Sequence, residues 1–274
     1  MADIIHELQD YTRLSWTLVR SSSGTAGSFL KSQEETPQGK IYYKLSNYNS
    51  AEGIIGHESV NEIIADRLLT ILGIEHLHYQ LIHARILIDG KPYETWICAS
   101  GNFRARGESK TPLDKFYKAE RLSPDESELS FCLRMGWADY IYRMLVVDYL
   151  ILNRDRHGAN LEVLRNRYQK TLRLAPLFDH GLSFFCRSET DDALDREDVM
   201  ADKPVQCFVG SRSAWNNLKL IPRDSFPDLS PLKDEHKAFL LDGLNGIISA
   251  KRQEKTWEMI RRRWQAYENL CHPG

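Results

Sequence analysis

Two short polar segments in the second half of the chain carry the residue types that phosphoryl transfer from ATP requires. Residues 153–160, Asn-Arg-Asp-Arg-His-Gly-Ala-Asn, place Asp155 five positions before Asn160. Residues 178–181, Phe-Asp-His-Gly, add Asp179. In this chemistry one carboxylate accepts or orients the attacking hydroxyl, while a carboxamide and a second carboxylate hold the magnesium ions that bridge the phosphates. We therefore expect Asp155 to be catalytic and Asn160 and Asp179 to be metal ligands.

The phosphates of ATP also need a cation, and that cation needs a carboxylate to hold it in place. Lys44, in a predicted strand, fits the first role, and Glu62, on the helix that follows, fits the second. Lys31 and Lys40 remain alternatives for the cation. Glu58 remains an alternative for the acid, because it lies one helical turn before Glu62.

A run of small residues, residues 21–28, is predicted to be a flexible loop that closes over the phosphates. Its backbone amides can donate hydrogen bonds to phosphate oxygens without steric bulk. The pattern G-x-x-x-x-G-K-[ST] is absent from the chain, so a P-loop nucleotide hydrolase is not expected. The candidates for contact with the nucleotide are Lys44, Glu62, Ile97 and Cys98 and, within the loop, Ser23, Gly24, Thr25, Ala26 and Gly27.

The histidines and one arginine run have weaker signals. His157 is a second catalytic candidate, which either contacts the transferred phosphate or orders the loop around it. His180 is expected to serve a turn or packing role. The other histidines show no spacing typical of metal ligands. Residues 261–263, three consecutive arginines, are expected to form a solvated helix face and no nucleic-acid patch.

Composition places the protein among cytoplasmic globular proteins. The chain has 274 residues and a net charge of -2, which gives no general attraction to nucleic acid or anionic membranes. Its five cysteines are scattered and include no C-x-x-C pair, which argues against a disulfide framework and against a zinc site. The N-terminus lacks the basic start and apolar run of a signal peptide, and no apolar stretch is long enough to span a bilayer.

The first hundred residues are predicted to be rich in strands and to contain one helix. The helix, residues 57–72, has apolar residues at helical spacing and Gly73 as its stop. Alternating and β-branched residues predict the strands. These are residues 14–20, a strand that begins at 29–31, residues 41–45, and a hairpin of residues 81–88 and 93–99.

The remainder is predicted to be mostly helical, so the fold class is α+β. The best helix is residues 131–152, and residues 233–270 return to helix with interruptions near Gly243 and Gly246. Residues 188–200 contain many acids and no periodicity, which predicts a mobile loop. Residues 161–164 and 171–178 predict two short strands, and this hairpin can bring Asp155 and Asp179 close together.

With these features, the chain resembles the HipA-like kinase family. The resemblance covers roughly residues 14–220, whereas the C-terminal helices are compatible with it but unspecific. The matching features are the loop 21–28, Lys44, Asn61 with Glu62, and residues 148–151, 153–160 and 175–181.

The resemblance implies a bilobal protein-kinase-like fold that phosphorylates Ser or Thr with ATP and Mg²⁺. A small strand-rich N-lobe would span residues 1–100, and a larger, mostly helical C-lobe would span residues 101–274. Family members phosphorylate a serine in their own loop, for which Ser22 and Ser23 are the candidates here. Many are toxins of toxin–antitoxin pairs, so a protein substrate and a small antitoxin are the implied partners.

The chain departs from related patterns at several points. Asn153 and Arg154 precede Asp155, so the H-R-D triplet of eukaryotic-type kinases is absent. His180 stands where those kinases have Phe, and no A-P-E element follows. The N-terminal part is also too short for the extra small domain of full-length HipA, which weakens the inference of a toxin.

Three alternatives stay open. Asp155, Arg156, His157 and Asn160 also resemble the D-R-H-x-x-N loop of phosphoinositide kinases, although residues 188–200 are acidic and an anionic membrane favours basic segments. A small-molecule phosphotransferase of the aminoglycoside type would share the same arrangement of loop residues. A pseudokinase that acts as a binding module is the third, and the presence of all the candidate residues argues against it.

Overall fold

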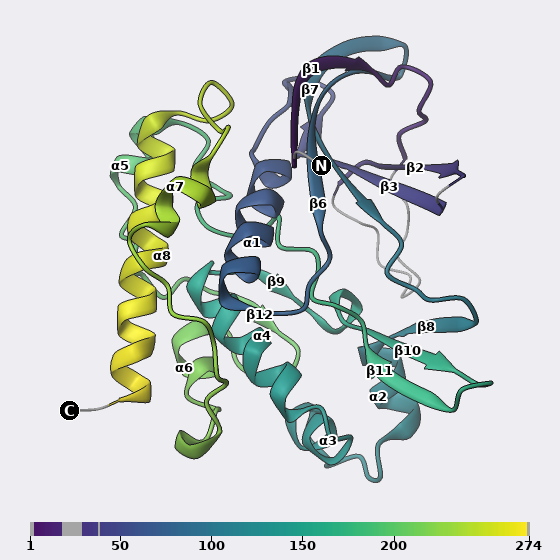
Figure 1. Cartoon of the computed structure of the whole chain (residues 1–274), viewed down its shortest axis with the longest axis vertical. Helices are drawn as coiled ribbons and strands as arrows, with labels where there is room; N and C mark the ends of the chain where they lie inside the picture. The colour runs from purple at the N-terminus through teal and green to yellow at the C-terminus, as the bar shows by residue number, and fades with distance from the viewer. Residues whose placement is uncertain (1–2, 18–28, 38, 273–274) are drawn as a thin grey trace.

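Alternating apolar and polar residues in the first hundred positions build a five-stranded sheet (Figure 1). The structure, a computed structural model, describes residues 3–17, 29–37 and 39–272. The strand order is β1-β6-β7-β3-β2, with β1 parallel to β6 and the other neighbours antiparallel. The bounds are β1 Ile4–Asp10, β2 Lys31–Thr36, β3 Gly39–Leu45, β6 Tyr79–Ile88 and β7 Lys91–Gly101, with a separate pair β4 Tyr48–Asn49 and β5 Gly53–Ile54.

In β3 and β7 successive side chains point to opposite faces of the sheet, and this alternation decides which of them reach the site. Leu45 and Ile97 lie in the same register and pack into one apolar cluster. Lys44 and Cys98, also paired in register, point to the other face, where α1 and the cleft lie. This alternation aims Lys44 at the site.

Helix α1, Glu58–Leu72, crosses one face of this sheet and confirms the helix predicted at residues 57–72 (Figure 1). Gly73 ends it in the left-handed conformation with φ 69°, and its backbone N–H caps the last carbonyls of the helix. The hairpin predicted at residues 81–99 is also confirmed by β6 and β7.

The C-terminal part is mostly helical and includes a small antiparallel sheet of order β11-β10-β8. A parallel pair, β9 with β12, links the loop after α4 to a segment about fifty residues later. The elements of the C-terminal part are β8 Glu108–Pro112, α2 Leu113–Glu120, α3 Glu128–Arg134, α4 Ala138–Leu150, β9 Asp155–Arg156, β10 Glu162–Asn166, β11 Thr171–Leu174, α5 Asp191–Asp195, β12 Gln206–Cys207, α6 Ala214–Leu218, α7 His236–Leu241 and α8 Ala250–Cys271, with 3₁₀ turns at Gly158–Asn160 and Arg223–Ser225.

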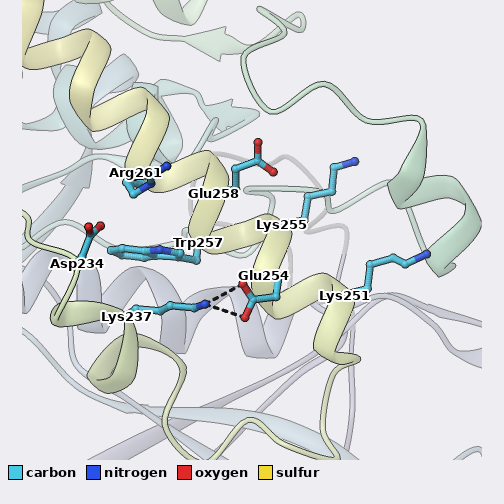
Figure 2. A pocket seen from close by; sticks show the side chains of 8 residues that line it. All are labelled: Asp234, Lys237, Lys251, Glu254, Lys255, Trp257, Glu258 and Arg261. Carbon is cyan, nitrogen blue, oxygen red and sulfur yellow. Dashed lines mark hydrogen bonds and ion pairs between the residues drawn. The ribbon is translucent and has the colours of Figure 1, made fainter.

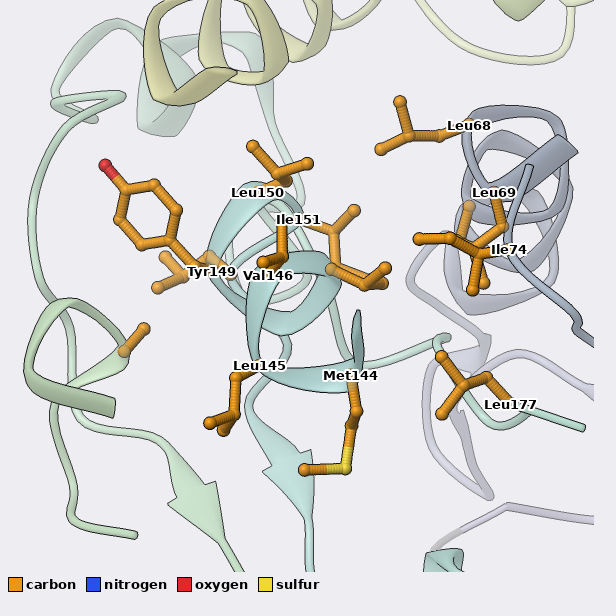
Figure 3. Packing of buried hydrophobic residues seen from close by; sticks show 14 of the residues in the cluster. Leu68, Leu69, Ile74, Met144, Leu145, Val146, Tyr149, Leu150, Ile151 and Leu177 are labelled. Carbon is orange, nitrogen blue, oxygen red and sulfur yellow. The ribbon is translucent and has the colours of Figure 1, made fainter. Parts of the chain in front are cut away.

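One large core connects the two parts of the chain. Helix α4 lies at its centre, with Val146 and Leu150 buried completely (Figure 3). Leu68 and Leu69 of α1 belong to the same cluster and face α4 across it. Helix α1 is therefore anchored to the helical part as well as to the sheet. Among the helices formed by described residues, none has both the length and the apolar character needed to cross a membrane.

The helix predicted at residues 131–152 is wrong as a single element. The structure has two helices, α3 and α4, because Gly136 adopts φ 77° between them. Trp137 N–H then donates to Cys132 O at 3.0 Å and closes the end of α3. The strand predicted at residues 171–178 is also shorter than expected, since β11 ends at Leu174.

The prediction of a mobile loop at residues 188–200 is wrong for its centre, which is helix α5. Thr190 caps this helix by accepting a hydrogen bond from Ala193 N–H. Lys251 Nζ lies 2.8 Å from Asp195, and Ser249 donates to Asp191, so the acids pair with the start of α8. The lack of hydrophobic periodicity reflects this polar contact.

The strand predicted at residues 14–20 is also corrected. The edge of the sheet beside β6 is taken by β1, which the sequence did not predict. A turn then follows, in which Asp10 accepts a hydrogen bond from Thr12 N–H at 2.9 Å. Thr17 forms only an isolated bridge to Lys31, and residues 18–20 lie outside the described part.

The arginine run at residues 261–263 does not form a uniformly solvated face. Arg261 and Arg262 are exposed, but Arg263 is buried against α4 and the segment after α5. Its guanidinium donates to the carbonyl oxygens of Val199 at 2.9 Å, Tyr149 at 3.0 Å and Ala201 at 2.8 Å. Arg261 and Arg262 are therefore solvated, whereas Arg263 connects α8 to buried backbone carbonyl groups.

Arg263→Met is expected to lower the free energy of unfolding by about 2 kcal/mol or more, because it leaves buried carbonyl groups without donors. Arg262→Met, one position away on the exposed face, is the matched control and is expected to change it by less than about 0.5 kcal/mol. Urea denaturation followed by circular dichroism measures both. Equal stability of the two variants would contradict the bridging role of Arg263.

Candidate active site

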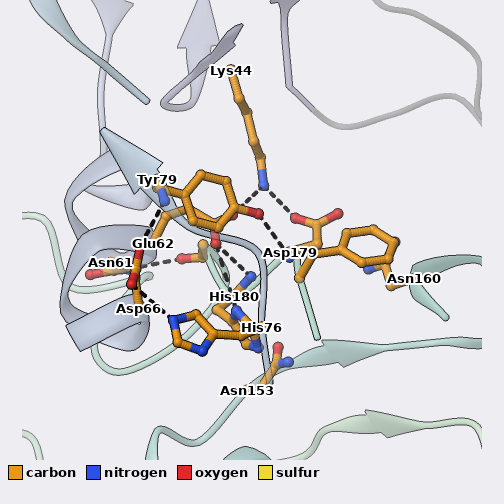
Figure 4. A network of polar contacts seen from close by, with 12 residues as sticks. Lys44, Asn61, Glu62, Asp66, His76, Tyr79, Asn153, Asn160, Asp179 and His180 are labelled. Carbon is orange, nitrogen blue, oxygen red and sulfur yellow. Dashed lines mark hydrogen bonds and ion pairs between the residues drawn. The ribbon is translucent and has the colours of Figure 1, made fainter. Parts of the chain in front are cut away.

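Lys44 is the centre of a polar network between the sheet, α1 and the segment at residues 178–181 (Figure 4). Its Nζ lies 2.9 Å from Glu62 Oε1 and also donates to Asp179 Oδ1. Lys40, an alternative for this role, pairs instead with Glu35 at 3.1 Å. Lys31 lines the same cavity as Lys44. The structure thus brings together Lys44, Glu62 and Asp179.

Glu62, and not Glu58, holds the lysine. The Glu62 side chain has no exposed surface, and its Oε2 accepts a hydrogen bond from His180 N–H at 2.8 Å. One carboxylate therefore connects the strand lysine to the backbone beside Asp179. Glu58 is also buried, but its carboxylate accepts from Asn47 N–H at 3.1 Å.

The charges in this network stabilise one another. Burial opposes the charged form of Lys44, but the carboxylates of Asp179 and Glu62 outweigh it and raise the pKa of Lys44 well above its usual value. Burial would raise the pKa of Asp179, but Lys44 and then Lys31 hold it well below the usual range. At neutral pH the site therefore contains an ammonium group and an ionised Asp179 carboxylate.

A buried ion pair holds the loop that carries Asp155. Arg156 has no exposed surface, and its Nε and Nη2 each lie 2.9 Å from an oxygen of Asp148 on α4. Its Nη1 donates to Phe178 O at 2.8 Å. Asn153 also donates to Asp148 at 2.9 Å, and its side-chain oxygen accepts from Asp155 N–H at 3.1 Å. These bonds fix the backbone on both sides of Asp155.

The rest of the loop presents Asn160 and His157. Asn160 Nδ2 donates to Asp155 O at 2.8 Å, which leaves the carboxamide oxygen as the atom that can meet a cation. His157 Nδ1 accepts from Ala159 N–H at 3.1 Å, so its proton lies on Nε2, 3.7 Å from Asp155 Oδ1. A Cβ at Gly158 would lie 2.7 Å from Phe208, so only glycine fits this close turn.

Asp155 lies in an environment that disfavours its charge. Burial comes first among the causes that raise its pKa, and the nearby Asp179 carboxylate adds to the effect, while His157 and Lys44 oppose it. The two polar segments are joined directly by the hydrogen bond from Arg156 Nη1 to Phe178 O at 2.8 Å, which places the residue after Asp155 against the residue before Asp179. A carboxylate with a raised pKa is a better proton acceptor than a free aspartate.

The segment at residues 178–181 is strained and tightly packed. Asp179 has φ 60°, an unusual value for a residue with a side chain, and its N–H donates to the Tyr79 hydroxyl at 3.2 Å. A Cβ at Gly181 would lie 3.2 Å from Glu58 Cβ. Asn61 donates to Gly181 O at 2.8 Å. Helix α1 thus holds this segment through side chains on one face.

His180 plays the packing role predicted for it. Its side chain is buried, with Nδ1 3.9 Å from Glu62 Oε2. Burial, followed by the nearby Arg156 and His76, lowers the pKa of His180 well below the usual value. It is therefore neutral at pH 7 and adds no charge beside Lys44.

A cavity of about 210 Å³ opens next to Lys44 and Asp179. Cys98 lines it, and burial raises the pKa of its thiol to about 12. Ile97 does not line it, because its side chain is fully buried in the cluster on the other face of β7. Glu62, whose side chain has no exposed surface, does not line the cavity either, so the structure separates two of the predicted nucleotide contacts, Ile97 and Glu62, from it.

Sequence reasoning missed part of this cavity. Phe103 and Phe178 stack with ring centroids 5.4 Å apart, and Tyr79 and Arg104 also line the wall. Phe103 and Arg104 lie two and three residues after Gly101, where β7 ends. The end of the predicted hairpin was the only signal for them, because aromatic residues after a strand are common in any fold. The loop at residues 21–28, with Ser22, Ser23, Gly24, Thr25, Ala26 and Gly27, lies outside the described residues.

A larger hollow of about 600 Å³ lies beside α7 and the first half of α8 (Figure 2). It is lined mainly by charged side chains, and two of them pair with each other, since Lys237 Nζ lies 2.7 Å from both oxygens of Glu254. It contains none of the predicted site residues. We therefore assign the candidate active site to the smaller cavity.

Comparison with known proteins establishes the fold. Scans against protein-family models and against curated protein sequences find no match. Among solved structures, the chain is similar to the proinflammatory kinase CtkA of Helicobacter pylori, with a TM-score of 0.68 and 15% identity over 96% of each chain. The chain has a protein-kinase-like fold. The predicted α+β, bilobal arrangement is confirmed, with a strand-rich N-lobe and a mostly helical C-lobe.

A second structure is less similar. HipA of Shewanella oneidensis MR-1, solved with HipB and operator DNA, matches with a TM-score of 0.39 and 14% identity. The match covers 89% of this chain and 57% of that one.

The donor set in this kinase-like fold fits magnesium. Mg²⁺ prefers oxygen ligands, usually one or two carboxylates together with phosphates and water. Asp179 provides an ionised carboxylate, and Asn160 provides a carboxamide oxygen whose amide nitrogen is already engaged. These two residues would hold the ion.

Asp155→Asn is expected to raise the melting temperature near pH 7 by a few degrees, because it removes a carboxylate whose folded-state pKa is raised. The unfolded chain loses the Asp155 proton at a lower pH than the folded chain does. At pH values above the pKa of the unfolded state, ionisation of Asp155 therefore lowers the free energy of unfolding. The difference in melting temperature between variant and wild type should therefore narrow as the pH falls toward about 4, because the folded residue, with its raised pKa, takes up its proton over that range. Thermal denaturation at both pH values measures this, and a less stable variant near pH 7 would contradict it.

Proposed function

We propose that the protein is an ATP- and Mg²⁺-dependent kinase that transfers the γ-phosphate to Ser or Thr hydroxyls of a protein. The observation that carries the proposal is the contact of Lys44 with both Glu62 and Asp179 beside the loop that holds Asp155. Protein kinases need this lysine–glutamate pair and a metal-binding aspartate in place for catalysis. The kinase-like fold supports the same activity.

Each residue has a role that its surroundings explain. Lys44, kept protonated by two carboxylates, binds the α- and β-phosphates as a point charge. Asn160 and Asp179 would hold Mg²⁺, which would supply positive charge to offset the charge that develops on the phosphates. Asp155 orients the acceptor hydroxyl and takes its proton, and its raised pKa suits this task. The Nε2–H of His157 faces this carboxylate and stabilises its charged form.

We propose a protein acceptor in place of a lipid because the segment that follows Asp179 is acidic. Asp191 and Asp195 of α5 are acidic and face Ser249 and Lys251 at the start of α8. An anionic lipid surface would favour basic residues there. Phosphoinositides and aminoglycosides remain the alternative acceptors, and a pseudokinase that only binds nucleotide is the alternative without catalysis.

The HipA-like resemblance extends the proposal to regulation and partners. A small antitoxin protein is the partner it implies, and a toxin role is the biological use. Ser22 or Ser23, in the loop outside the described residues, is the proposed site of autophosphorylation. The protein is proposed to act in the cytoplasm.

Incubation with labelled ATP and Mg²⁺ tests the reaction. We expect transfer to a casein-like protein, little or no transfer to phosphoinositide or aminoglycoside, and a loss of roughly 10²- to 10⁴-fold in Asp155→Asn, with ATP binding retained. Labelling of lipid or aminoglycoside alone would replace the protein-kinase proposal. Nucleotide binding without transfer to any acceptor would support the pseudokinase.

Lys44→Met is expected to reduce turnover roughly 100-fold or more, because methionine keeps the length of the side chain but removes the charge at the phosphates. Lys40→Met is the matched control on the same strand, since Lys40 pairs with Glu35 away from the cavity. Steady-state kinetics with varied ATP measures both variants. An inactive Lys40→Met variant beside an active Lys44→Met variant would move the phosphate contact to Lys40.

Autophosphorylation of the loop is expected to reduce activity. A phosphoserine at residue 22 or 23 adds about -1.5 to -2 charges and would compete with ATP for the loop amides and Lys44. Intact-mass spectrometry after incubation with Mg²⁺ and ATP should find phosphate on residues 21–28 of wild type and none in Asp155→Asn. An unmodified wild-type loop after prolonged incubation would rule the mechanism out.

A further inference from the structure

Three side chains outside the candidate active site converge on one point. Asp66, on α1, places its Oδ1 2.9 Å from His76 Nε2 and 3.1 Å from His78 Nδ1. The two histidines lie in the segment between α1 and β6, with ring centroids 4.5 Å apart. Figure 4 shows Asp66 and His76 facing each other below the Lys44 network. The residue spacing did not predict this cluster, because it matches none of the metal-binding motifs considered in the sequence analysis.

The hydrogen bonds around His76 leave a lone pair on the nitrogen that faces Asp66. His76 Nδ1 donates to Ile74 O at 2.6 Å, which places the ring proton on Nδ1 in the neutral form. Nε2 then presents a lone pair to an aspartate oxygen, and Thr70 Oγ1 is a more distant neighbour at 3.4 Å. Two acceptors at 2.9 Å repel each other unless a cation or an added proton lies between them.

The surroundings of the cluster match those of a bound transition metal. Histidine ligands of metals commonly donate their second ring N–H to a backbone carbonyl, as His76 does to Ile74. Asp66 Oδ2 accepts from Tyr79 N–H at 2.6 Å, so the carboxylate is held with Oδ1 toward the histidines.

We propose that Asp66, His76 and His78 bind one divalent transition metal ion, of which Zn²⁺ fits best. All three ligand atoms lie within 4.8 Å of one another. Ligand atoms of tetrahedral zinc lie about 3.3 Å apart, so the Asp66 contacts need to lengthen by only a few tenths of an ångström. The nitrogen ligands select against Mg²⁺, which favours oxygen. The side chain of His78 is 73% exposed, which leaves the fourth position to water.

This site would fasten α1 to the segment that leads to the catalytic cleft. Asp66 follows Glu62 by one helical turn on α1. The backbone N–H of Tyr79 donates a hydrogen bond to Asp66. The hydroxyl of Tyr79 accepts a hydrogen bond from the backbone N–H of Asp179. Leu77 N–H donates to Leu177 O at 2.8 Å. A metal here stabilises the folded protein and holds Glu62 and Asp179 at their present separation, and it does so whether or not the protein transfers phosphate.

Zinc binding to the full-length protein tests the proposal. After removal of metals with a chelator, Zn²⁺ is titrated in competition with a chromophoric chelator, in the presence of excess Mg²⁺. We expect one zinc per chain, a higher melting temperature with zinc, and binding that weakens as the pH falls, because protons compete with the metal for its ligands. His78→Ala should weaken binding by at least the roughly 10- to 100-fold that loss of a supporting group costs.

His83→Ala is the matched control, because His83 pairs with Glu94 at 3.1 Å and, among the residues that the structure describes, belongs to no group of three possible ligands. It should bind zinc as wild type does. Asp66→Asn keeps the shape of the carboxylate and should bind weakly, with circular dichroism showing that it is folded. Absence of zinc binding by wild type, or equal affinity in His78→Ala, overturns the proposal. A melting temperature that rises as the pH falls and does not respond to zinc assigns the cluster to protonated histidines and also overturns it.

Discussion

The ion pair between Asp148 and Arg156 is the interaction on which the geometry of the site depends. A fully buried guanidinium is costly unless each of its donors is satisfied, and here they bond to a carboxylate on α4 and to the carbonyl of Phe178. Three parts of the chain are thereby fixed to one group: the helix before the catalytic loop, the loop itself, and the residue before Asp179. Loss of either charge would leave the other unpaired in the core.

Helix α1 is the second constraint, because nearly every face of it is used. Its apolar side chains join the sheet to the core around α4. Its polar residues Asn61, Glu62 and Asp66 bind the segment at Gly181, the lysine at residue 44 and the two histidines. A helix with so little solvated surface cannot rotate without breaking several of these contacts, so the lobes are coupled through it.

The sequence predicted those features that are local. The period of α1 and the alternation of β3, β6 and β7 are strong patterns, and Asp155 and Asn160 lie within one short loop. The break at Gly136 was missed because a glycine inside an apolar helical pattern is usually tolerated. Tyr79 and Phe103 were missed because their partners, Asp179 and Phe178, are far away in the chain.

Two further misses have the same origin in tertiary structure. Arg263 belongs to a charged run, and only the packing of α8 against α4 shows that it is buried and its neighbours are not. The cluster of Asp66, His76 and His78 exists because α1 ends at Gly73 and the chain turns back along it. Neither the burial nor the convergence can be obtained from residue spacing alone.

The environment of Cys98 has a practical consequence for labelling. Its thiol, with a pKa of about 12, has a thiolate fraction on the order of one in 10⁵ at neutral pH. Burial is also the first cause of the raised pKa values of the other four cysteines, Cys132, Cys186, Cys207 and Cys271. A cysteine introduced at an exposed position would have an ordinary pKa near 8.5 and, compared with the most buried of them, a thiolate fraction larger by on the order of a thousandfold. Fluorophores or spin labels for measuring the distance between the two lobes can therefore be attached to this protein without first removing Cys98 or Cys132, both of which are buried.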